Sequence, residues 1–184
     1  FRPLVTEALT VKEALVLLLL MLSAALGLVA LTNTLTVQLS VVGAVLAMLY
    51  PLMKRVTHWP QIVLGLAFSW SIPMAFAAST HTLPNELWWL FAANVLWTVV
   101  YDTQYAMVDR EDDLSVGIKS TAILFGDLDV RMIGLLQALC IISFWQCGMA
   151  FGLGPIYFSA VAAVAIMFIR HLWFIRHRDT TQCF

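Results

Sequence analysis

The chain has 184 residues, of which 61% are hydrophobic and 11% are charged, whereas soluble globular domains carry roughly 25% charged residues. This composition excludes an ordinary soluble domain, and a formal net charge of -1 without a basic run excludes a nucleic-acid partner. A membrane helix needs about 20 apolar residues, so the chain has room for about six of them. We therefore predict an all-α fold, a multi-pass transmembrane helical bundle that forms a single domain.

Apolar segments follow one another along the chain, separated by short polar turns. Thr10 and Glu13 have the Thr-x-x-Glu spacing of a capping box and predict a helix start near Val11. Pro60 opens a later helix, in which Pro73 predicts a kink because proline removes one helical hydrogen bond. The predicted spans cover residues 11–31, 36–53, 60–78, 86–108, 130–151 and 156–175.

If the spans alternate in direction, every basic residue falls on one side of the membrane. The loops of the opposite side, near residues 33, 82 and 153, have only Glu86 close by as a charge. Cytoplasmic loops carry an excess of lysine and arginine, so we expect the basic side to face the cytoplasm. Its basic residues are Arg2, Lys12, Lys54, Arg55, Arg110, Lys119, Arg131, Arg170, Arg176 and Arg178.

An acidic stretch, residues 101–121, lies on the same side as these basic residues. Five of the eleven acidic residues fall within it. On a continuous helix, at about 100° per residue, Asp102, Asp109 and Asp113 point within about 20° of a common direction. We predict that these three carboxylates form one stripe. The other two acidic residues point elsewhere and are expected to be solvated, namely Glu111 and Asp112.

The stripe is costly unless it binds a cation. Asp102 lies inside a predicted span, where an ionised carboxylate costs at least about 2.5–3.5 kcal/mol and usually marks function. Carboxylates in the last turn of a helix also oppose its dipole, by about 0.3–1 kcal/mol each. Oxygen ligands favour a hard ion, and Mg2+ is commonly held by one or two carboxylates with waters and substrate phosphates. We predict that Asp109 and Asp113 bind Mg2+; the alternative is a solvated helix end that only stops the span.

Cations on the same side of the membrane are candidate contacts for a diphosphate. Lys54 and Arg55 end the second predicted span, and Lys119 follows the acidic stretch. These side chains can contact a diphosphate whose other oxygens bind the metal. The segment 117–121 is no P-loop, because the pattern GxxxxGK[ST] is absent. For Lys54 and Arg55 the alternative role is simple anchoring at the membrane surface.

Other polar residues within the spans favour structural roles. We expect Asn94, Ser69, Ser71 and Gln137 to form hydrogen bonds between helices. The histidines lie in loops or at a basic helix end, and none is expected to be a ligand or a general base. They are His58, His81, His171 and His177.

Three segments resemble a known family. Residues 101–113, YDTQYAMVDREDD, followed by GIKSTA at 117–122, closely resemble the second aspartate-rich motif of the UbiA-type membrane prenyltransferases. Residues 50–55 resemble the Tyr-x-x-x-Lys element of that family, and residues 2–4 resemble the end of its first motif loop. Within the family, the chain is most similar to the 4-hydroxybenzoate polyprenyltransferases of ubiquinone biosynthesis.

The resemblance implies a bundle of nine helices in the inner (plasma) membrane, around a cavity open to the bilayer. Two aspartate-rich motifs would hold Mg2+ and the diphosphate of a polyprenyl donor there. The prenyl group would pass to the ring carbon ortho to the hydroxyl of 4-hydroxybenzoate. By match with the motif, Asp109 and Asp113 would coordinate the metal, Asp102 would support the site, and Lys54 and Lys119 would lie near the diphosphate.

The first aspartate-rich motif of the family, Asn-Asp-x-x-Asp-x-x-x-Asp, is absent and would precede Arg2. The first two helices and the last helix of the family also have no counterpart. We therefore expect the chain to be an internal portion of the enzyme that is inactive without the missing N-terminal helices.

Two other functions are compatible with the residues. The first is a prenyltransferase of the same superfamily that uses another acceptor, such as homogentisate, naphthoate or a haem precursor. The second is a cation-coupled membrane transporter, in which Asp102 and Asn94 would be the coupling residues.

Overall fold

The computed structural model describes residues 3–4 and 6–178. Within these residues the ordered elements are helices, without any strand, so the predicted all-α fold class is confirmed. In chain order the elements are α1 (Val11–Ala30), α2 (Thr34–Val56), α3 (Pro60–Ser69), α4 (Ser71–Thr80), α5 (Leu87–Val108), α6 (Arg110–Ser115), α7 (Thr121–Phe125), the 3-10 helix η1 (Gly126–Leu128), α8 (Asp129–Ala150) and α9 (Pro155–Ile175).

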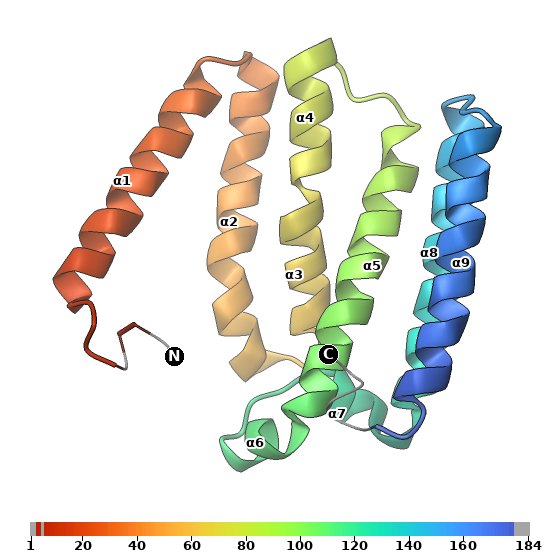
Figure 1. Ribbon diagram of the computed structural model, residues 1–184. Helices are drawn as coiled ribbons and strands as arrows, with labels where there is room; N and C mark the ends of the chain where they lie inside the picture. Colours follow the sequence, from red (N-terminus) through yellow and green to blue (C-terminus); the bar gives the residue numbers. More distant parts are fainter. Residues whose placement is uncertain (1–2, 5, 179–184) are drawn as a thin grey trace.

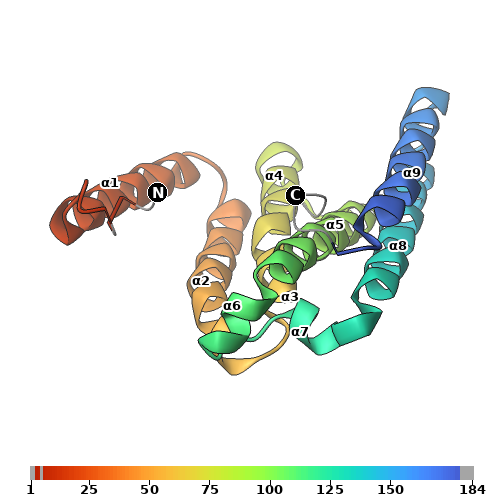
Figure 2. The same cartoon turned by 60° about the horizontal axis from the view of Figure 1, so that its bottom comes forward.

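The long helices run side by side between the two ends of the molecule, and α3 and α4 continue one another as a single bent rod (Figure 1). The short helices α6 and α7 lie together at one end. Seen from that end, the long helices form a curved row rather than a closed ring, from α1 through α2, α3 and α5 to α8 and α9 (Figure 2). No residue of α1 is buried, in agreement with its separation from α2 in both views.

Local sequence determines where the helices begin and bend. The Thr10 hydroxyl accepts a hydrogen bond from the Glu13 N–H at 3.3 Å, and the Glu13 carboxylate accepts one from the Thr10 N–H at 2.8 Å. The predicted capping box is therefore confirmed. The predicted bend lies at Trp70, before Pro73, because the proline has no N–H for the carbonyl of Ser69. The Trp70 indole donates to the Leu39 carbonyl of α2 at 2.8 Å.

Helix α5 lies between α3 and α8 and joins the two halves of the row. It approaches α3 closely at Gly65, where an added Cβ would lie 3.0 Å from the Val95 carbonyl oxygen. Toward α8, the Cys140 thiol donates to the Ala93 carbonyl at 3.3 Å. A buried hydrophobic cluster supports the same contact and includes the last residue of α9; it consists of Val100, Ile133 and Ile175.

Within the described residues, five segments are long and apolar enough to cross a membrane: 11–30, 34–56, 60–80, 121–150 and 155–175. Helix α5 is not among them, although its 22 residues match its neighbours in length. Three of its polar residues are covered by protein, namely Thr98, Thr103 and Gln104. The low hydropathy of α5 thus reflects its place inside the bundle.

Candidate functional site

The three aspartates of the predicted stripe line one cavity at the end of the molecule that carries α6 and α7. Its volume is about 50 Å3, which suits an ion and its waters rather than a whole substrate. Helices α2, α3, α5 and α6 all contribute to its wall. The lining residues are Lys54, Gln61, Asp102, Tyr105, Ala106, Asp109 and Asp113.

The acidic stretch is not one continuous helix. Helix α5 ends at Val108, Asp109 lies at the junction, and α6 begins at Arg110. The Asp113 N–H still donates to the Asp109 carbonyl at 2.8 Å, so the two residues keep helical spacing across the junction. The break moves Asp113 from the last turn of one helix to the first turn of the next, where the helix dipole favours a negative charge. The expected dipole penalty at this position was therefore wrong.

Burial distinguishes the carboxylates of this stretch. One oxygen of Asp102, Oδ2, is buried without a hydrogen-bond partner among the described residues. Asp113 is half-buried and Asp109 is exposed. Burial raises the pKa of the Asp113 carboxyl above its usual value, while the nearby Lys54 ammonium acts in the opposite direction. The two acidic residues expected to be solvated are exposed and do not line the cavity, namely Glu111 and Asp112.

Lys54 is the basic residue that lines the carboxylate cavity. It lies in the last turn of α2, where a cation is favoured by the helix dipole. Its ammonium lies 5.9 Å from the centroid of the Tyr50 ring, one helical turn earlier. The neighbouring Arg55 is exposed and does not line the cavity.

Lys119 holds the loop after α6 against the end of α2. Its backbone N–H donates to the Lys54 carbonyl at 2.9 Å, and its ammonium donates to the Val56 carbonyl at 3.1 Å. Gly117 allows this turn with a φ of +71°, because glycine adopts left-handed backbone conformations without strain. Lys119 thus contacts α2 and does not line the cavity.

A buried hydrogen-bond network fixes α3 and α7 beside the carboxylates. The Gln61 side-chain oxygen accepts a hydrogen bond from the Thr121 N–H at 3.0 Å. The Thr103 and Thr121 hydroxyls lie 2.7 Å apart, and Thr103 donates to the Val99 carbonyl at 2.6 Å. Gln61 is only 1% exposed, so its position in the cavity wall is set by α7.

Behind the cavity, Asp129 binds two arginines from distant parts of the chain. The Asp129 side chain is fully buried and forms salt bridges with Arg110 and Arg178. Arg178 also donates to the Asp127 carbonyl at 2.9 Å. The hydrogen bonds to Asp129 hold the pKa of the Arg178 guanidinium above its usual value. This cluster joins Arg110, the residue after Asp109, to the start of α8 at Asp129. It also joins both to Arg178, which follows the end of α9.

Sequence reasoning missed Gln61 and Tyr105 in the cavity wall. Gln61 is a single polar residue directly after Pro60 at the start of an apolar helix, a signal that could have been used. Tyr105 lies one helical turn before Asp109. The helical periodicity that groups the aspartates therefore also places Tyr105 on their side of the helix. The expected hydrogen bond between helices is confirmed for Asn94, which donates to the Ser69 hydroxyl at 2.9 Å. The same expectation for Ser71 was wrong, because its hydroxyl donates to the Phe68 carbonyl three residues earlier at 2.9 Å. It was also wrong for Gln137, because its buried amide has no partner in the described part of the chain.

The donor set fits a hard cation. Asp102 supplies a buried carboxylate oxygen without a partner, and two further carboxylates line the same cavity. Among the described residues, no three His, Cys, Asp or Glu side chains are grouped closely enough to hold a metal by themselves. An ion held here would take its remaining ligands from waters and phosphate oxygens, which is the usual coordination of Mg2+.

Comparisons with known proteins agree with this geometry. The model of the UbiA prenyltransferase family matches residues 1–184. The chain is 54% identical over 183 residues to a protein from Chromohalobacter salexigens, and this match covers 100% of the chain and 61% of that protein. It is 51% identical to a protein from Vibrio vulnificus, of which 64% is covered. Both relatives are named 4-hydroxybenzoate octaprenyltransferase.

The structure is also similar to a solved membrane protein. The apo structure of a UbiA homolog from Aeropyrum pernix K1 superposes with a TM-score of 0.83 at 26% identity, covering 99% of this chain and 70% of that one. The chain spans 61% of the length of the relative from Chromohalobacter salexigens and 64% of the length of the relative from Vibrio vulnificus.

Proposed function

Because the chain belongs to the UbiA prenyltransferase family, we propose that it forms part of an intramembrane aromatic prenyltransferase of ubiquinone biosynthesis. The enzyme transfers a polyprenyl group from polyprenyl diphosphate to the ring of 4-hydroxybenzoate. The observation that carries this proposal is the cavity that joins Asp102, Asp109 and Asp113 with Lys54. The names of the relatives support the choice of acceptor.

In this proposal the carboxylate cavity binds the diphosphate end of the donor. Asp109 and Asp113 hold Mg2+, and the unpartnered oxygen of Asp102 supports it from α5. When bound, Mg2+ neutralises charge on the leaving diphosphate. Lys54 contacts the diphosphate directly. Lys119 acts indirectly, because its backbone N–H donates to the Lys54 carbonyl at 2.9 Å and so fixes the end of α2. Arg55 adds a positive charge at the entrance.

The reaction needs no nucleophile from the protein. The bond between C1 of the allylic chain and its diphosphate oxygen breaks, and the electron pair leaves on the diphosphate. A new bond forms between C1 and the ring carbon ortho to the phenol hydroxyl, and the proton of that carbon passes to water. Lys54 stabilises the leaving diphosphate, because a preorganised cation is strongest where charge develops. The apolar bundle protects the allylic cation from hydrolysis.

We also propose that α5 crosses the bilayer with the five apolar segments, so that the chain has the six spans expected from the sequence. Its buried polar face supports this. The carboxylate cavity then faces the cytoplasm at the inner membrane, since α6 lies beside the end of α2 (Figure 1), whose last turn carries Lys54 and Arg55.

The transporter alternative receives no support from the geometry. It required Asn94 and Asp102 to act together as coupling residues. Asn94 instead donates to Ser69 at 2.9 Å and does not line the carboxylate cavity. We therefore retain the prenyltransferase as the single proposed function.

The test is prenylation of 4-hydroxybenzoate by the full-length protein that contains this chain, reconstituted in lipid vesicles with a polyprenyl diphosphate. We expect product that requires Mg2+ and disappears with EDTA. Homogentisate and a hydroxynaphthoate should give little product. Efficient transfer to either of them would show that 4-hydroxybenzoate is not the preferred acceptor. The 184-residue chain alone should be inactive, because it spans only 61% and 64% of the length of its two relatives. Full activity of that chain, or transfer unaffected by EDTA, would contradict the proposal.

A further inference from the structure

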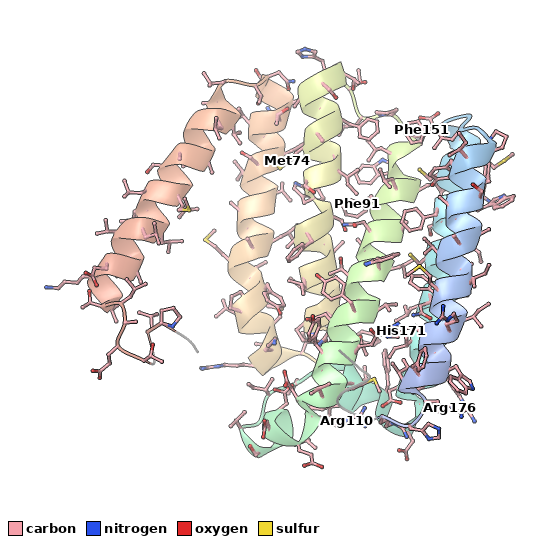
Figure 3. The ribbon with its side chains drawn as sticks, viewed as in Figure 1. Met74, Phe91, Arg110, Phe151, His171 and Arg176 are labelled. Atoms are coloured by element: carbon pink, nitrogen blue, oxygen red, sulfur yellow. The ribbon has the colours of Figure 1, made fainter. Side chains whose placement is uncertain are left out.

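A cavity of about 290 Å3 lies between α8 and α9, and among the described residues only these two helices line it. It differs from the cavity in which Trp97 of α5 meets His171 of α9; Figure 3 shows His171 between α5 and α9. Phe168 lines both cavities. Ile142 and Ile169 line the α8–α9 cavity and are 53% and 69% exposed, so it opens at the surface of the helix pair.

Most of the wall of the α8–α9 cavity is formed by aliphatic side chains, together with the Phe168 ring. The two helices come close at Gly134, where an added Cβ would lie 3.3 Å from Cδ1 of Leu172. From Gly134 to Ile142 the cavity follows α8 for about 12 Å. Its volume is close to the lower end of the usual range for small-molecule sites, about 300–1,000 Å3. The space is therefore sufficient for one ring with a short chain.

Gln137 is the single polar side chain among the described residues that form this wall. It is only 2% exposed, and both its Nε2 and its Oε1 are buried without a hydrogen-bond partner in the described part of the chain. Buried amides are normally paired, because an unmade hydrogen bond in the interior costs stability. Across the cavity, α9 offers no side-chain partner, since it contributes Ala165, Phe168, Ile169 and Leu172. Both ends of the amide are therefore available to a ligand.

The position of Gln137 along α8 excludes the headgroup of a phospholipid as its partner. Helix α8 begins at Asp129, eight residues earlier, which is about 12 Å along the helix. Segments 121–150 and 155–175 are long and apolar enough to cross a membrane, whose hydrocarbon core is about 30 Å thick. With the start of α8 at the membrane surface, the amide lies within this core, where lipid chains have neither donor nor acceptor. The ligand must therefore be lipid-soluble and carry its own polar group.

The chemistry of the wall favours an uncharged ligand with a hydroxyl group. Among the described residues, no charged side chain lines the cavity, so an ionised group would lose its hydration without gaining a counter-charge. A hydroxyl both donates and accepts, and can therefore satisfy the N–H group and the carbonyl of one carboxamide. An ether oxygen only accepts and would leave Oε1 of Gln137 unpaired. The Phe168 ring favours an aromatic ring beside that hydroxyl, since aromatic rings pack in offset or edge-to-face pairs.

We propose that the α8–α9 cavity binds an uncharged, lipid-soluble phenol, whose hydroxyl accepts from Gln137 Nε2 and donates to Gln137 Oε1 while its ring packs against Phe168. The site is distinct from the carboxylate cavity, because the two share no lining residue. It does not suit 4-hydroxybenzoate, whose carboxylate would lie among apolar side chains. The inference is thus independent of the proposed function and stands even if prenyl transfer is not observed.

The experiment measures binding of 4-hexylphenol to the full-length protein in nanodiscs, with empty nanodiscs to subtract partition into lipid. The matched ligand is 4-hexylanisole, in which a methyl group replaces the hydroxyl proton, so the bond to Oε1 cannot form. We expect the wild-type Kd for the phenol to be about tenfold lower than the Kd for the ether, because the ether leaves a buried acceptor unpaired. Gln137→Leu should bind the two ligands equally. An excess of 4-hydroxybenzoate should not displace the phenol from the wild-type protein.

Two further variants control for effects of the substitution itself. Gln104→Leu is the matched control, because Gln104 is also buried and its Nε2 has no partner among the described residues, yet it does not line the cavity. It should keep the wild-type preference for the phenol. Ala138→Phe fills the cavity from α8 and should weaken binding of both ligands. Without ligand, Gln137→Leu should not lower the melting temperature, because the amide has no partner to lose.

Four results would each overturn the phenol site. The first is equal binding of phenol and ether by the wild-type protein, and the second is displacement of the phenol by 4-hydroxybenzoate, which would place it in another cavity. The third is an unchanged preference for the phenol in Gln137→Leu, or an equal loss of that preference in Gln104→Leu. The fourth is a lower melting temperature of ligand-free Gln137→Leu, which would show that Gln137 pairs with another part of the full-length protein.

Discussion

At the scale of single residues, the structure separates two lysines that the sequence left equivalent. Lys54 lines the carboxylate cavity, whereas the Lys119 ammonium donates to the Val56 carbonyl at 3.1 Å. The sequence could group the acidic residues because they are close in the chain and keep helical spacing across the α5–α6 junction. It could not place Lys119, because its contact depends on how a loop folds back on a helix 63 positions earlier.

Replacing Lys54 should therefore affect donor binding more than replacing Lys119. We expect Lys54→Gln to lower kcat/KM for polyprenyl diphosphate by about 10- to 100-fold, because a charged hydrogen bond to the diphosphate is lost. Lys119→Gln removes a bond to a backbone carbonyl and should cost less than about tenfold. Initial rates against donor concentration measure both. A larger loss in Lys119→Gln would place Lys119, not Lys54, on the diphosphate.

At the scale of helices, the capping box of Thr10 and Glu13 predicted where α1 begins. The predicted start near Val11 agrees with α1, and the predicted loop near residue 33 lies between α1 and α2. The division of the acidic stretch at Asp109 was not predicted, since residues 102–113 contain neither proline nor glycine to mark a break. The bend near Pro73 was expected, and it lies at Trp70 because Pro73 has no N–H for the Ser69 carbonyl.

The close approach of α3 and α5 can be tested at Gly65. An added Cβ would lie 3.0 Å from the Val95 carbonyl oxygen, so Gly65→Ala must push the helices apart. We expect a loss of about 1–3 kcal/mol in the free energy of unfolding, as for other overpacked sites. Gly27→Ala is the matched control, because nothing lies within 4 Å of a Cβ there. Thermal unfolding in detergent measures both, and equal melting temperatures would refute the close approach.

The Asp129 cluster is a second contact between elements that can be tested. Asp129→Ala leaves Arg110 and Arg178 without their shared carboxylate, which is fully buried. We expect destabilisation of about 3 kcal/mol, the lower end for a broken buried ion pair, because Arg178 remains partly exposed. Asp127→Ala should change stability by less than about 0.5 kcal/mol, since Arg178 contacts only its backbone carbonyl. Similar melting temperatures for the two variants would show that the cluster is not a structural clamp.

At the scale of the whole molecule, composition predicted the class of protein, and the motif predicted the family. Neither could show that α5 packs between α3 and α8 and has buried polar residues. Neither could show that Trp97 and His171 share a cavity. These features depend on packing between distant segments. The curved row of helices leaves α1 without buried residues, and we propose that other parts of the full-length protein cover it.

We propose that the carboxylate stripe of Asp102, Asp109 and Asp113 is the catalytic centre of a magnesium-dependent prenyltransferase. The most direct measurement is the rate of prenyl transfer to 4-hydroxybenzoate by Asp109→Asn and Asp113→Asn in the full-length protein, with Asp112→Asn as the exposed control outside the cavity. We predict that kcat falls by at least about 10²- to 10³-fold in the first two variants, the usual effect of losing transition-state charge stabilisation, and by less than about twofold in the control. Wild-type rates in both Asp109→Asn and Asp113→Asn would contradict the account.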